Sequence, residues 1–367
     1  MHSPYLLTPG PLTTSAHTRE AMLRDWGSRE RDFIELTAHV RTSLCALAGA
    51  APSHDCVLVQ GSGTFAAEAA IQTLVPRNAK LLVLVNGAYG RRMVEIARRL
   101  GRDTAMLEWD EDKPIDEGAV ADALKKDAAI THLAIVHCET TSGILNPVER
   151  IAEIAAEYGK GLLIDAISAF GAIPLDLRRV RCTALIGSGN KCLEGVPGIA
   201  FVIADTEALA AATGNATSVS LDLHAQWQGF VKTGQWRFTP PTHVLAALAS
   251  ALEQHAEEGS TQARGERYAR NCRALLAGMK RLGFTPVLEE AHQAPIIVTF
   301  HRPPQLDFDI FHEKLKQRGF VIYPGKLTRI DTFRIGCIGA IDETVINGAV
   351  AAVEEVIKEM GLLARAF

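Results

Sequence analysis

The sequence lacks several features that mark specialised classes of protein. Its seven cysteines are scattered and none forms a CxxC pair, which argues against a disulfide framework and against a structural zinc site. No apolar run approaches the roughly 20 residues that a membrane-spanning helix needs. The first fourteen residues have no basic segment followed by an apolar one, so they do not resemble a signal peptide. We therefore expect a cytoplasmic protein with no metal site and no membrane partner.

The chain also lacks a large excess of charge of either sign. The formal net charge is −4 over 367 residues, which gives no general attraction to nucleic acid or to an anionic membrane. Hydrophobic residues make up 47% and charged residues 22% of the chain, the balance of an ordinary soluble globular protein. Any anionic ligand must therefore be held by local hydrogen-bond donors and not by the overall field.

Helical patterns alternate with short apolar runs over residues 16–258. The helical patterns cover 31–48, 64–75, 90–100, 116–126, 147–158 and 245–257, and the apolar runs cover 56–59, 81–85, 104–107, 133–136, 161–164, 184–188 and 199–203. Strand–helix alternation with apolar strands predicts an α/β domain, in which helices sandwich a mainly parallel sheet.

The pattern changes at both ends of this region. Residues 1–15 are rich in Pro, Gly and Thr and predict an extended N-terminal arm, which needs a surface to pack on, such as a partner subunit. Residues 259–367 predict a smaller α+β C-terminal domain, joined to the large domain by the helix over 245–257. Its helices are expected over 263–281, over 307–318 and from 342, and its strands over 296–300, 321–323 and 332–335.

A glycine-rich turn stands between an apolar run and a helical pattern. Ser62, Gly63 and Thr64 occupy this turn. Glycine lets the backbone approach an anion closely, and a helix start supplies free N–H groups and a favourable dipole. The turn is not a Walker A loop, since no lysine follows its second glycine, and it lacks the third glycine of a dinucleotide fingerprint. Taken alone, such a turn is as often a tight turn without a ligand.

Two charged residues follow apolar runs further along the chain. Asp165 ends the run 161–164, at the edge where open α/β sheets bind ligands. Lys191 lies in a Ser/Gly-rich turn after the run 184–188, and a lysine in confined apolar surroundings has the lowered pKa that suits an amine nucleophile. Taken singly, Asp165 reads as a helix cap or loop charge, and Lys191 as a surface lysine.

The three features together are more specific than any one of them. A phosphate cup, an aspartate about a hundred residues later and a lysine 26 residues after the aspartate is the order typical of fold type I enzymes that use pyridoxal 5′-phosphate (PLP). In that interpretation Lys191 forms a Schiff base with PLP, Asp165 keeps the pyridine nitrogen protonated, and the cup carries the phosphate.

The chain resembles the class V aminotransferases of PLP fold type I nearly from end to end. The segments that carry the resemblance are LLTPGP at 6–11, RDWGS at 24–28, NGAYG at 86–90, HCETTSG at 137–143, GNK at 189–191, WRFTPPT at 236–242, YPGKLT at 323–328 and FRIG at 333–336. Two of them, WRFTPPT and PGKLT, are similar to segments of the class V enzymes that take 2-aminoethylphosphonate as amine donor and pyruvate as acceptor.

The resemblance implies further roles, residue by residue. Tyr89 would stack on the cofactor ring, Thr140 would bind the ring oxygen, and Asn190 would lie beside the cofactor. Thr239 would reach the phosphate from a neighbouring subunit, and Trp236 lies on the same loop, so a homodimer with a shared active site is expected. Arg334 would bind the anionic group of the substrate, because a planar guanidinium matches a carboxylate or phosphonate in bidentate fashion.

Other functions stay open at this point. An alanine- or serine-glyoxylate aminotransferase shares the lysine, aspartate and arginine, and a PLP lyase acting on a hydroxylated aminophosphonate is a second alternative. A non-catalytic PLP-fold binding module is disfavoured, because the lysine is present and no DNA-binding segment is fused. Arg29-Glu30 follows RDWGS where the related enzymes often carry Trp-Asp, which bears on the substrate more than on the class.

Overall fold

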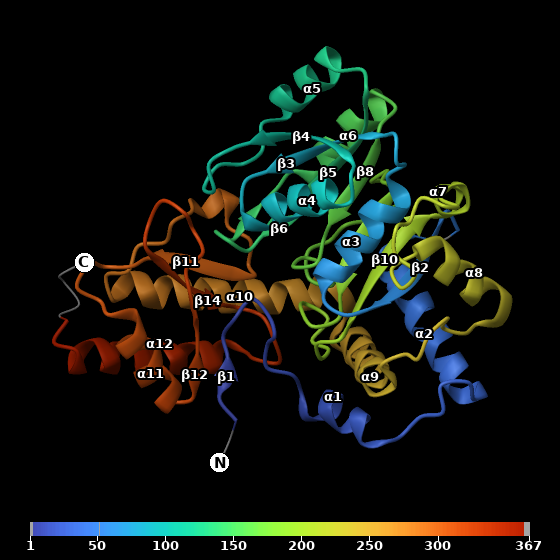
Figure 1. Cartoon of the computed structure of the whole chain (residues 1–367). Coiled ribbons are helices and arrows are strands. Elements are labelled where there is room, and N and C mark those ends of the chain that lie inside the picture. Colours follow the sequence, from blue (N-terminus) through green and yellow to red (C-terminus); the bar gives the residue numbers. More distant parts are fainter. Residues whose placement is uncertain (1–2, 51, 363–367) are drawn as a thin grey trace.

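A seven-stranded sheet forms the centre of the larger part of the molecule, in a computed structural model that describes residues 3–50 and 52–362 (Figure 1). The strand order is β2-β10-β9-β8-β5-β3-β4. The strands are β2 (His54–Gln60), β3 (Lys80–Val85), β4 (Asp103–Glu108), β5 (Ile130–Val136), β8 (Gly161–Asp165), β9 (Ala184–Ser188) and β10 (Ile199–Asp205). Every neighbouring pair is parallel except the two that involve β10, so the prediction of a mainly parallel sheet is confirmed.

The reversed direction of β10 follows from the connection before it. The ten residues between β9 and β10 contain Lys191 but no helix. Parallel neighbours require a crossover of a dozen or more residues, whereas a short connection returns the chain antiparallel. The turn that carries Lys191 therefore stays at the sheet edge instead of crossing a face.

Helices cover both faces of this sheet, as its apolar strands predict. They are α2 (Arg31–Leu47), α3 (Gly63–Leu74), α4 (Ala88–Arg99), α5 (Glu117–Lys126), α6 (Val148–Glu157), α7 (Thr206–Ala211), α8 (Leu223–Thr233) and α9 (Thr242–Glu258). Helices α7 and α8 were not predicted from the sequence, although α8 carries ordinary helix start and stop signals. Asp222 caps its start by accepting from the Ala225 N–H at 2.9 Å, and Gly234 ends it with φ +69°.

A second core surrounds a three-stranded antiparallel sheet of order β11-β14-β13. Its strands are β11 (Ile297–His301), β13 (Tyr323–Pro324) and β14 (Thr332–Gly336), and its helices are α10 (Ser260–Arg281), α11 (Phe308–Gln317) and α12 (Glu343–Glu359). Phe333 lies at its centre, with the rings of Phe284, Phe300 and Phe311 all within 5.6 Å of its own. A domain boundary near residue 259 stays a prediction.

The N-terminal arm packs on its own chain. Strand β1 (Tyr5–Leu6) pairs in parallel with β12 (Phe320–Val321), and Leu7 is buried in the second core. The predicted strand over 321–323 is in fact two strands, since β12 pairs with the arm while β13 pairs with β14. The short helix α1 (Ala16–Glu20) follows the arm, capped by the Ser15 hydroxyl, and leads into the single turn η1 (Ala21–Leu23). A separate two-stranded ribbon is formed by β6 (Cys138–Glu139) and β7 (Ile144–Leu145).

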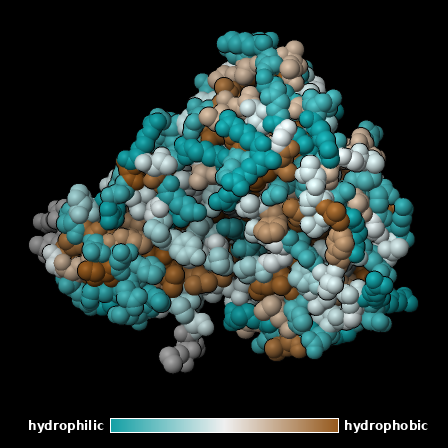
Figure 2. All heavy atoms as spheres, viewed as in Figure 1, coloured by the Kyte–Doolittle hydropathy of each residue, from teal (hydrophilic) through white to brown (hydrophobic). Residues whose placement is uncertain are grey.

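The visible face of the molecule is mostly hydrophilic, with apolar residues in separate groups between hydrophilic ones (Figure 2). No helix in the described part of the chain is long and apolar enough to cross a membrane. Residues 3–50 and 52–362 also contain no group of three or more His, Cys, Asp or Glu side chains placed to hold a metal ion.

Candidate active site

Three predicted features meet at the edge of the large sheet where the parallel strands end. Ser62 follows β2, Asp165 ends β8, and Lys191 follows β9. The strand order places β9 directly beside β8, with Asp165 opposite Ile186 in register, and places β10 between β9 and β2. Open α/β sheets bind ligands at this carboxyl edge.

Lys191 projects from the turn between β9 and β10 into a confined place. Its Nζ atom donates a hydrogen bond to the main-chain oxygen of Pro9. Burial lowers the pKa of Lys191 below its ordinary value, and the neighbouring Tyr89 and Asp165 only partly oppose this shift. A lowered pKa leaves more of the amine unprotonated, which is the state that acts as nucleophile or base.

Asp165 is a buried carboxyl group, 5% exposed. Burial raises its pKa to about 7, and the charge of Glu139 adds to the shift, while the Ile167 N–H, which donates to Oδ1 at 3.0 Å, opposes it. The charges of Lys191 and Arg92 also favour the ionised form. A carboxyl group held in this state is ready to ionise when a cation such as a protonated ring nitrogen lies against it.

The cup at Ser62 leaves hydrogen-bond donors free. Helix α3 begins at Gly63, and the Ser62 hydroxyl makes no capping bond there. A Cβ atom on Gly63 would lie 2.5 Å from Cδ1 of Ile167, so any larger residue here would have to displace the Ile167 side chain. The N–H groups of Ser62, Gly63 and Thr64 have no acceptor among the described residues. The cup therefore presents unpaired donors and the positive end of a helix dipole, as an anion site requires.

Tyr89 lies close to Lys191, and Thr140 lies close to Tyr89. Burial alone would raise the pKa of Tyr89, but the charge of Lys191 and the Thr140 hydroxyl lower it overall. Although it is close enough to Tyr89 to affect that pKa, the buried Oγ1 atom of Thr140 has no partner with full hydrogen-bond geometry in the described chain. A buried hydroxyl without a partner is costly, and a ligand oxygen would satisfy it.

Arg334 comes to the same place from the second core. It lies on β14 and is 2% exposed. Its Nε donates to the Pro324 oxygen at 3.0 Å and its Nη1 to the Thr140 oxygen at 2.9 Å. Burial lowers the pKa of Arg334, and nearby Tyr89 and Glu139 oppose the shift. Its Nη2 group has no acceptor among the described residues, so one end of the guanidinium is available to an anion.

The sequence model of the aminotransferase class V family matches residues 14–328. The chain belongs to this family. It is 56% identical over 362 residues to a 2-aminoethylphosphonate–pyruvate transaminase of Pseudomonas fluorescens, covering 98% of both chains. It is 55% identical to the transaminase of the same name from Pseudomonas putida, covering 99% of both.

Solved structures of other aminotransferases share the fold. A pyridoxamine–pyruvate aminotransferase from Mesorhizobium loti superposes with a TM-score of 0.89 at 23% identity, covering 98% of this chain and 93% of the other. An alanine–glyoxylate aminotransferase from Nostoc gives a TM-score of 0.90 at 24% identity, covering 97% and 96%. The expected fold of the class V aminotransferases is therefore confirmed.

Two further residues, which were not singled out from the sequence, lie at this candidate site of the class V aminotransferase. Arg92 on α4 donates from Nη1 to Oγ1 of Thr64 at 3.3 Å, and its guanidinium carbon lies 4.9 Å from the Tyr89 ring centre. It has no carboxylate partner in the described chain. A helical period places Arg92 three residues after Tyr89, on the same face, and this spacing is the signal that was available in the sequence.

The second of these residues is Glu139, which is fully buried. Its carboxylate accepts from the N–H groups of Tyr89 at 3.0 Å, Gly90 at 3.3 Å and Thr141 at 3.1 Å. Burial raises its pKa, and these hydrogen bonds oppose the shift. Glu139 thereby holds the first turn of α4, and with it Tyr89, against the loop that carries Thr140. Its only sequence signal was membership of the HCETTSG segment.

The remaining predicted residues have contacts within their own chain. Asn190 accepts from the Ser188 hydroxyl at 2.6 Å. The Trp236 indole N–H donates to Oγ1 of Thr37 at 3.3 Å, and its ring packs edge-on against another aromatic ring. The main-chain oxygen of Thr239 accepts from the Gln60 side chain. The described contacts thus tie Trp236 to the large core, and the cofactor-binding roles of all three residues stay predictions.

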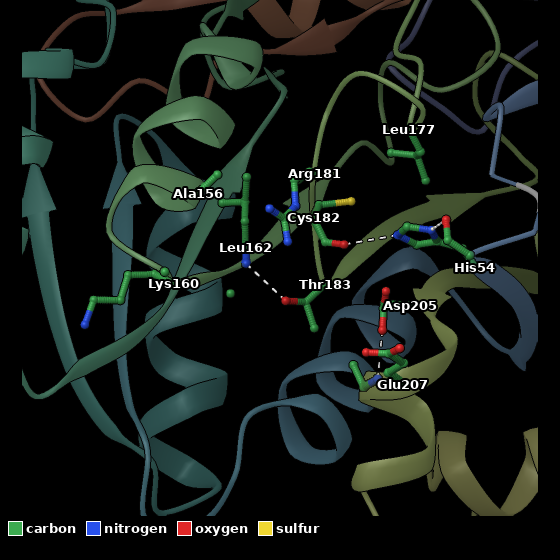
Figure 3. Close-up of a pocket in the computed structure, with 14 residues that line it drawn as sticks. His54, Ala156, Lys160, Leu162, Leu177, Arg181, Cys182, Thr183, Asp205 and Glu207 are labelled. Atoms are coloured by element: carbon green, nitrogen blue, oxygen red, sulfur yellow. Dashed lines mark hydrogen bonds between the residues drawn. The ribbon is translucent and has the colours of Figure 1, made fainter.

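The cavity in Figure 3 has a volume of about 500 Å³ and lies at the opposite, amino-terminal edge of the large sheet. Its lining includes Gly161 and Leu162 at the start of β8, Thr183 before β9, and His54 at the start of β2. The Leu162 N–H donates to Oγ1 of Thr183 at 3.2 Å, and His54 bonds the Cys182 oxygen at 3.1 Å (Figure 3). None of the predicted site residues lines this cavity.

Proposed function

We propose that this class V aminotransferase moves the amino group of 2-aminoethylphosphonate to pyruvate, giving phosphonoacetaldehyde and L-alanine, with PLP as cofactor. Relatives of this name include proteins that are 52–56% identical to the chain over at least 98% of its length. One observation carries the proposal: Asp165 ends β8, Lys191 lies in the turn after the neighbouring strand β9, and Arg334 reaches the same group of residues from the second core.

The residues present fit PLP. The free N–H groups of the cup, the unbonded Ser62 hydroxyl and the uncompensated charge of Arg92 suit a dianionic phosphate. The unpartnered Thr140 hydroxyl suits a ring oxygen. Asp165, with its raised pKa, suits a ring nitrogen that carries a proton, and Tyr89 offers an aromatic face.

PLP, when bound, supplies an electron sink for the charge that develops on the substrate carbon. The Asp165 carboxylate would hold the proton on the ring nitrogen. Lys191 would bind the cofactor covalently before the amine substrate arrives. Once displaced, its Nζ atom would act as the general base that removes the proton from the amine-bearing carbon of the substrate, because burial leaves more of the amine unprotonated.

Arg334 would bind the anionic group of each substrate in turn. Its guanidinium is fixed on two sides by the oxygens of Pro324 and Thr140, so the free Nη2 group keeps one direction. The first half-reaction brings a phosphonate and the second a carboxylate. A planar, preorganised guanidinium can bind both anions, because each presents two acceptor oxygens at similar spacing.

A homodimer would complete the site, in agreement with the expected role of Thr239. Phe238, next to Thr239, and Phe65, next to the cup, are 49% and 50% exposed. Covering these rings with a second copy of the chain would remove apolar surface from water, which is a main driving force of association. Light scattering on the holoenzyme tests this proposal, and a monomer with full activity would contradict it. We place the enzyme in the cytoplasm as a further proposal.

A set of coupled assays tests the substrates. With 2-aminoethylphosphonate and pyruvate, we expect alanine and phosphonoacetaldehyde in equal amounts. Faster turnover of L-serine or L-alanine with glyoxylate would assign the chain to the glyoxylate aminotransferases. Release of ammonia without consumption of pyruvate would indicate a lyase.

A further inference from the structure

The turn that carries Lys191 contains a backbone conformation that side chains rarely adopt. Glu194 has φ +61°, one of two such non-glycine residues in the part of the chain that the structure describes. Its N–H donates to the Lys191 oxygen at 2.8 Å, so this conformation closes the turn directly onto the lysine. A glycine would take this conformation without steric cost. The glutamate side chain must therefore contribute something that offsets the cost.

The Glu194 side chain is held by one face of α10. It is almost fully buried, and its Oε1 atom accepts from the Tyr268 hydroxyl at 2.5 Å and from Nη2 of Arg267 at 2.8 Å. Nη1 of Arg264 lies 3.5 Å from the same oxygen. Positions 264, 267 and 268 recur at helical spacing, so a single helix face presents two guanidinium groups and a hydroxyl to this carboxylate.

A second carboxylate balances the charge. Glu258 accepts from Nε of Arg264 at 2.6 Å and from Nε of Arg267 at 2.7 Å. Burial alone would raise the pKa of Glu258, but the two arginines lower it to about 2. Two carboxylates thus face two guanidinium groups, which makes the cluster neutral. Removing one carboxylate would leave an uncompensated charge in a buried place.

The remaining donors of the arginines reach both parts of the site. Nη1 of Arg264 donates to the oxygen of Cys192, the residue after Lys191, at 2.7 Å. Nη1 of Arg267 donates to the oxygens of Gly339 at 2.6 Å and Ile341 at 2.8 Å. Residues 339–341 follow β14, the strand that carries Arg334. The cluster is therefore bonded to the lysine turn at one end and to the segment after the arginine strand at the other.

We propose that Glu194 is a positioning residue, which fixes the Lys191 turn relative to the strand that carries Arg334. The proposal rests on the proposed function, since it assumes that Lys191 and Arg334 serve the same substrate. Glu194 touches no reacting atom. It acts by keeping constant the separation between the amine of Lys191 and the group that binds the substrate anion, to which transfer rates are sensitive.

Two substitutions test this role in the holoenzyme. Glu194→Ala keeps a similar backbone cost but removes the acceptor, whereas Glu194→Gln keeps an acceptor oxygen and removes the charge. We expect Glu194→Ala to lower the single-turnover rate with 2-aminoethylphosphonate about tenfold and to shift the pH midpoint of the holoenzyme's absorbance band. Glu194→Gln should change both the rate and the pH midpoint less than Glu194→Ala does. Tyr268→Phe removes one hydrogen bond at nearly constant volume and should change both readouts in the same direction, in case the Glu194 variants do not fold.

Asp55→Asn is the matched control. Asp55 accepts from Arg41 at 2.8 Å and from the Trp227 indole at 3.0 Å, at the far end of β2. This variant removes a partly buried carboxylate from a guanidinium and an aromatic donor, as Glu194→Gln does, and should lower thermal stability without changing the absorbance midpoint or the rate.

A double variant tests the link to Arg334. The single-turnover rate of the double variant with Glu194→Gln and Arg334→Lys should fall by less than the product of the two separate fold-losses. The position of the Lys191 turn matters less once the substrate anion is loosely held. The proposal is overturned if the Glu194 and Tyr268 variants behave like Asp55→Asn, or if the two losses multiply. Failure of the proposed function is recognised separately, because 2-aminoethylphosphonate would then leave the spectrum of the unaltered enzyme unchanged.

Discussion

The Nζ atom of Lys191 donates a hydrogen bond to the main-chain oxygen of Pro9, a residue 182 positions earlier in the chain. The N-terminal arm thereby lies directly over the amine. Gly10 follows with φ +106°, and a Cβ atom there would lie 2.7 Å from Cδ and 2.9 Å from Nζ of Lys191. The arm thus contributes a wall of the candidate active site and is not merely an extension of the fold.

Gly10→Ala should therefore impair the lysine directly. The added methyl group displaces the Lys191 side chain, and we expect a single-turnover rate about tenfold lower, measured by stopped-flow absorbance. Gly101→Ala is the control, because Gly101 also has a positive φ of +68° but has nothing within 4 Å of its Cβ position. Equal losses of rate in the two variants would show that backbone strain, and not contact with Lys191, is responsible.

Asp165 should make the stability of the cofactor-free chain depend on pH. Its pKa is raised to about 7 in the folded chain, so the folded state binds a proton that the unfolded state has released between about pH 4 and pH 7. The free energy of unfolding of the cofactor-free chain therefore falls as the pH rises from about 4 to about 7. Compared with Asp165→Asn, it should lose up to about 4 kcal/mol. Urea unfolding of both proteins at pH 5 and pH 8 measures the difference, and parallel pH profiles would contradict the assignment.

Arg92 should contribute to the affinity for PLP. Arg92→Gln removes the positive charge beside Thr64, and loss of a charge-assisted hydrogen bond to phosphate should weaken binding about tenfold or more. Titration of the cofactor-free chain with PLP, followed by fluorescence, gives the dissociation constant. Arg91→Gln is a matched control, since Arg91 is the preceding residue of α4 but pairs with Glu108 and Glu111. The same weakening in both variants would remove Arg92 from the phosphate site.

Arg334→Lys should affect binding of both substrates. A lysine keeps the charge but loses the two hydrogen bonds that fix the guanidinium and the bidentate geometry. We expect the KM values for 2-aminoethylphosphonate and for pyruvate to rise together, by about tenfold or more, while the absorbance of the resting holoenzyme is unchanged. A rise for one substrate alone would mean that the two anions use different groups.

The large sheet was predictable because most of its strands are short apolar runs that lie between helical patterns. The positions of Asp165 and Lys191 at one edge of this sheet were predictable, since Asp165 ends one such run and Lys191 lies in the turn after another. The contact between Lys191 and Pro9 was not, because it joins segments 182 residues apart and depends on β1 pairing with β12. Glu139 was missed as well, because only the tertiary structure brings its carboxylate to the start of α4.

The absorbance band of the holoenzyme tests the central claim most directly. Adding 2-aminoethylphosphonate without pyruvate should bleach the band, because the amine is transferred once and Lys191 is released. Adding pyruvate should restore the band and yield one equivalent of alanine, and Lys191→Ala should show neither change. A band that is unaffected by 2-aminoethylphosphonate but bleached by L-serine would contradict the proposed substrate and leave only the aminotransferase class.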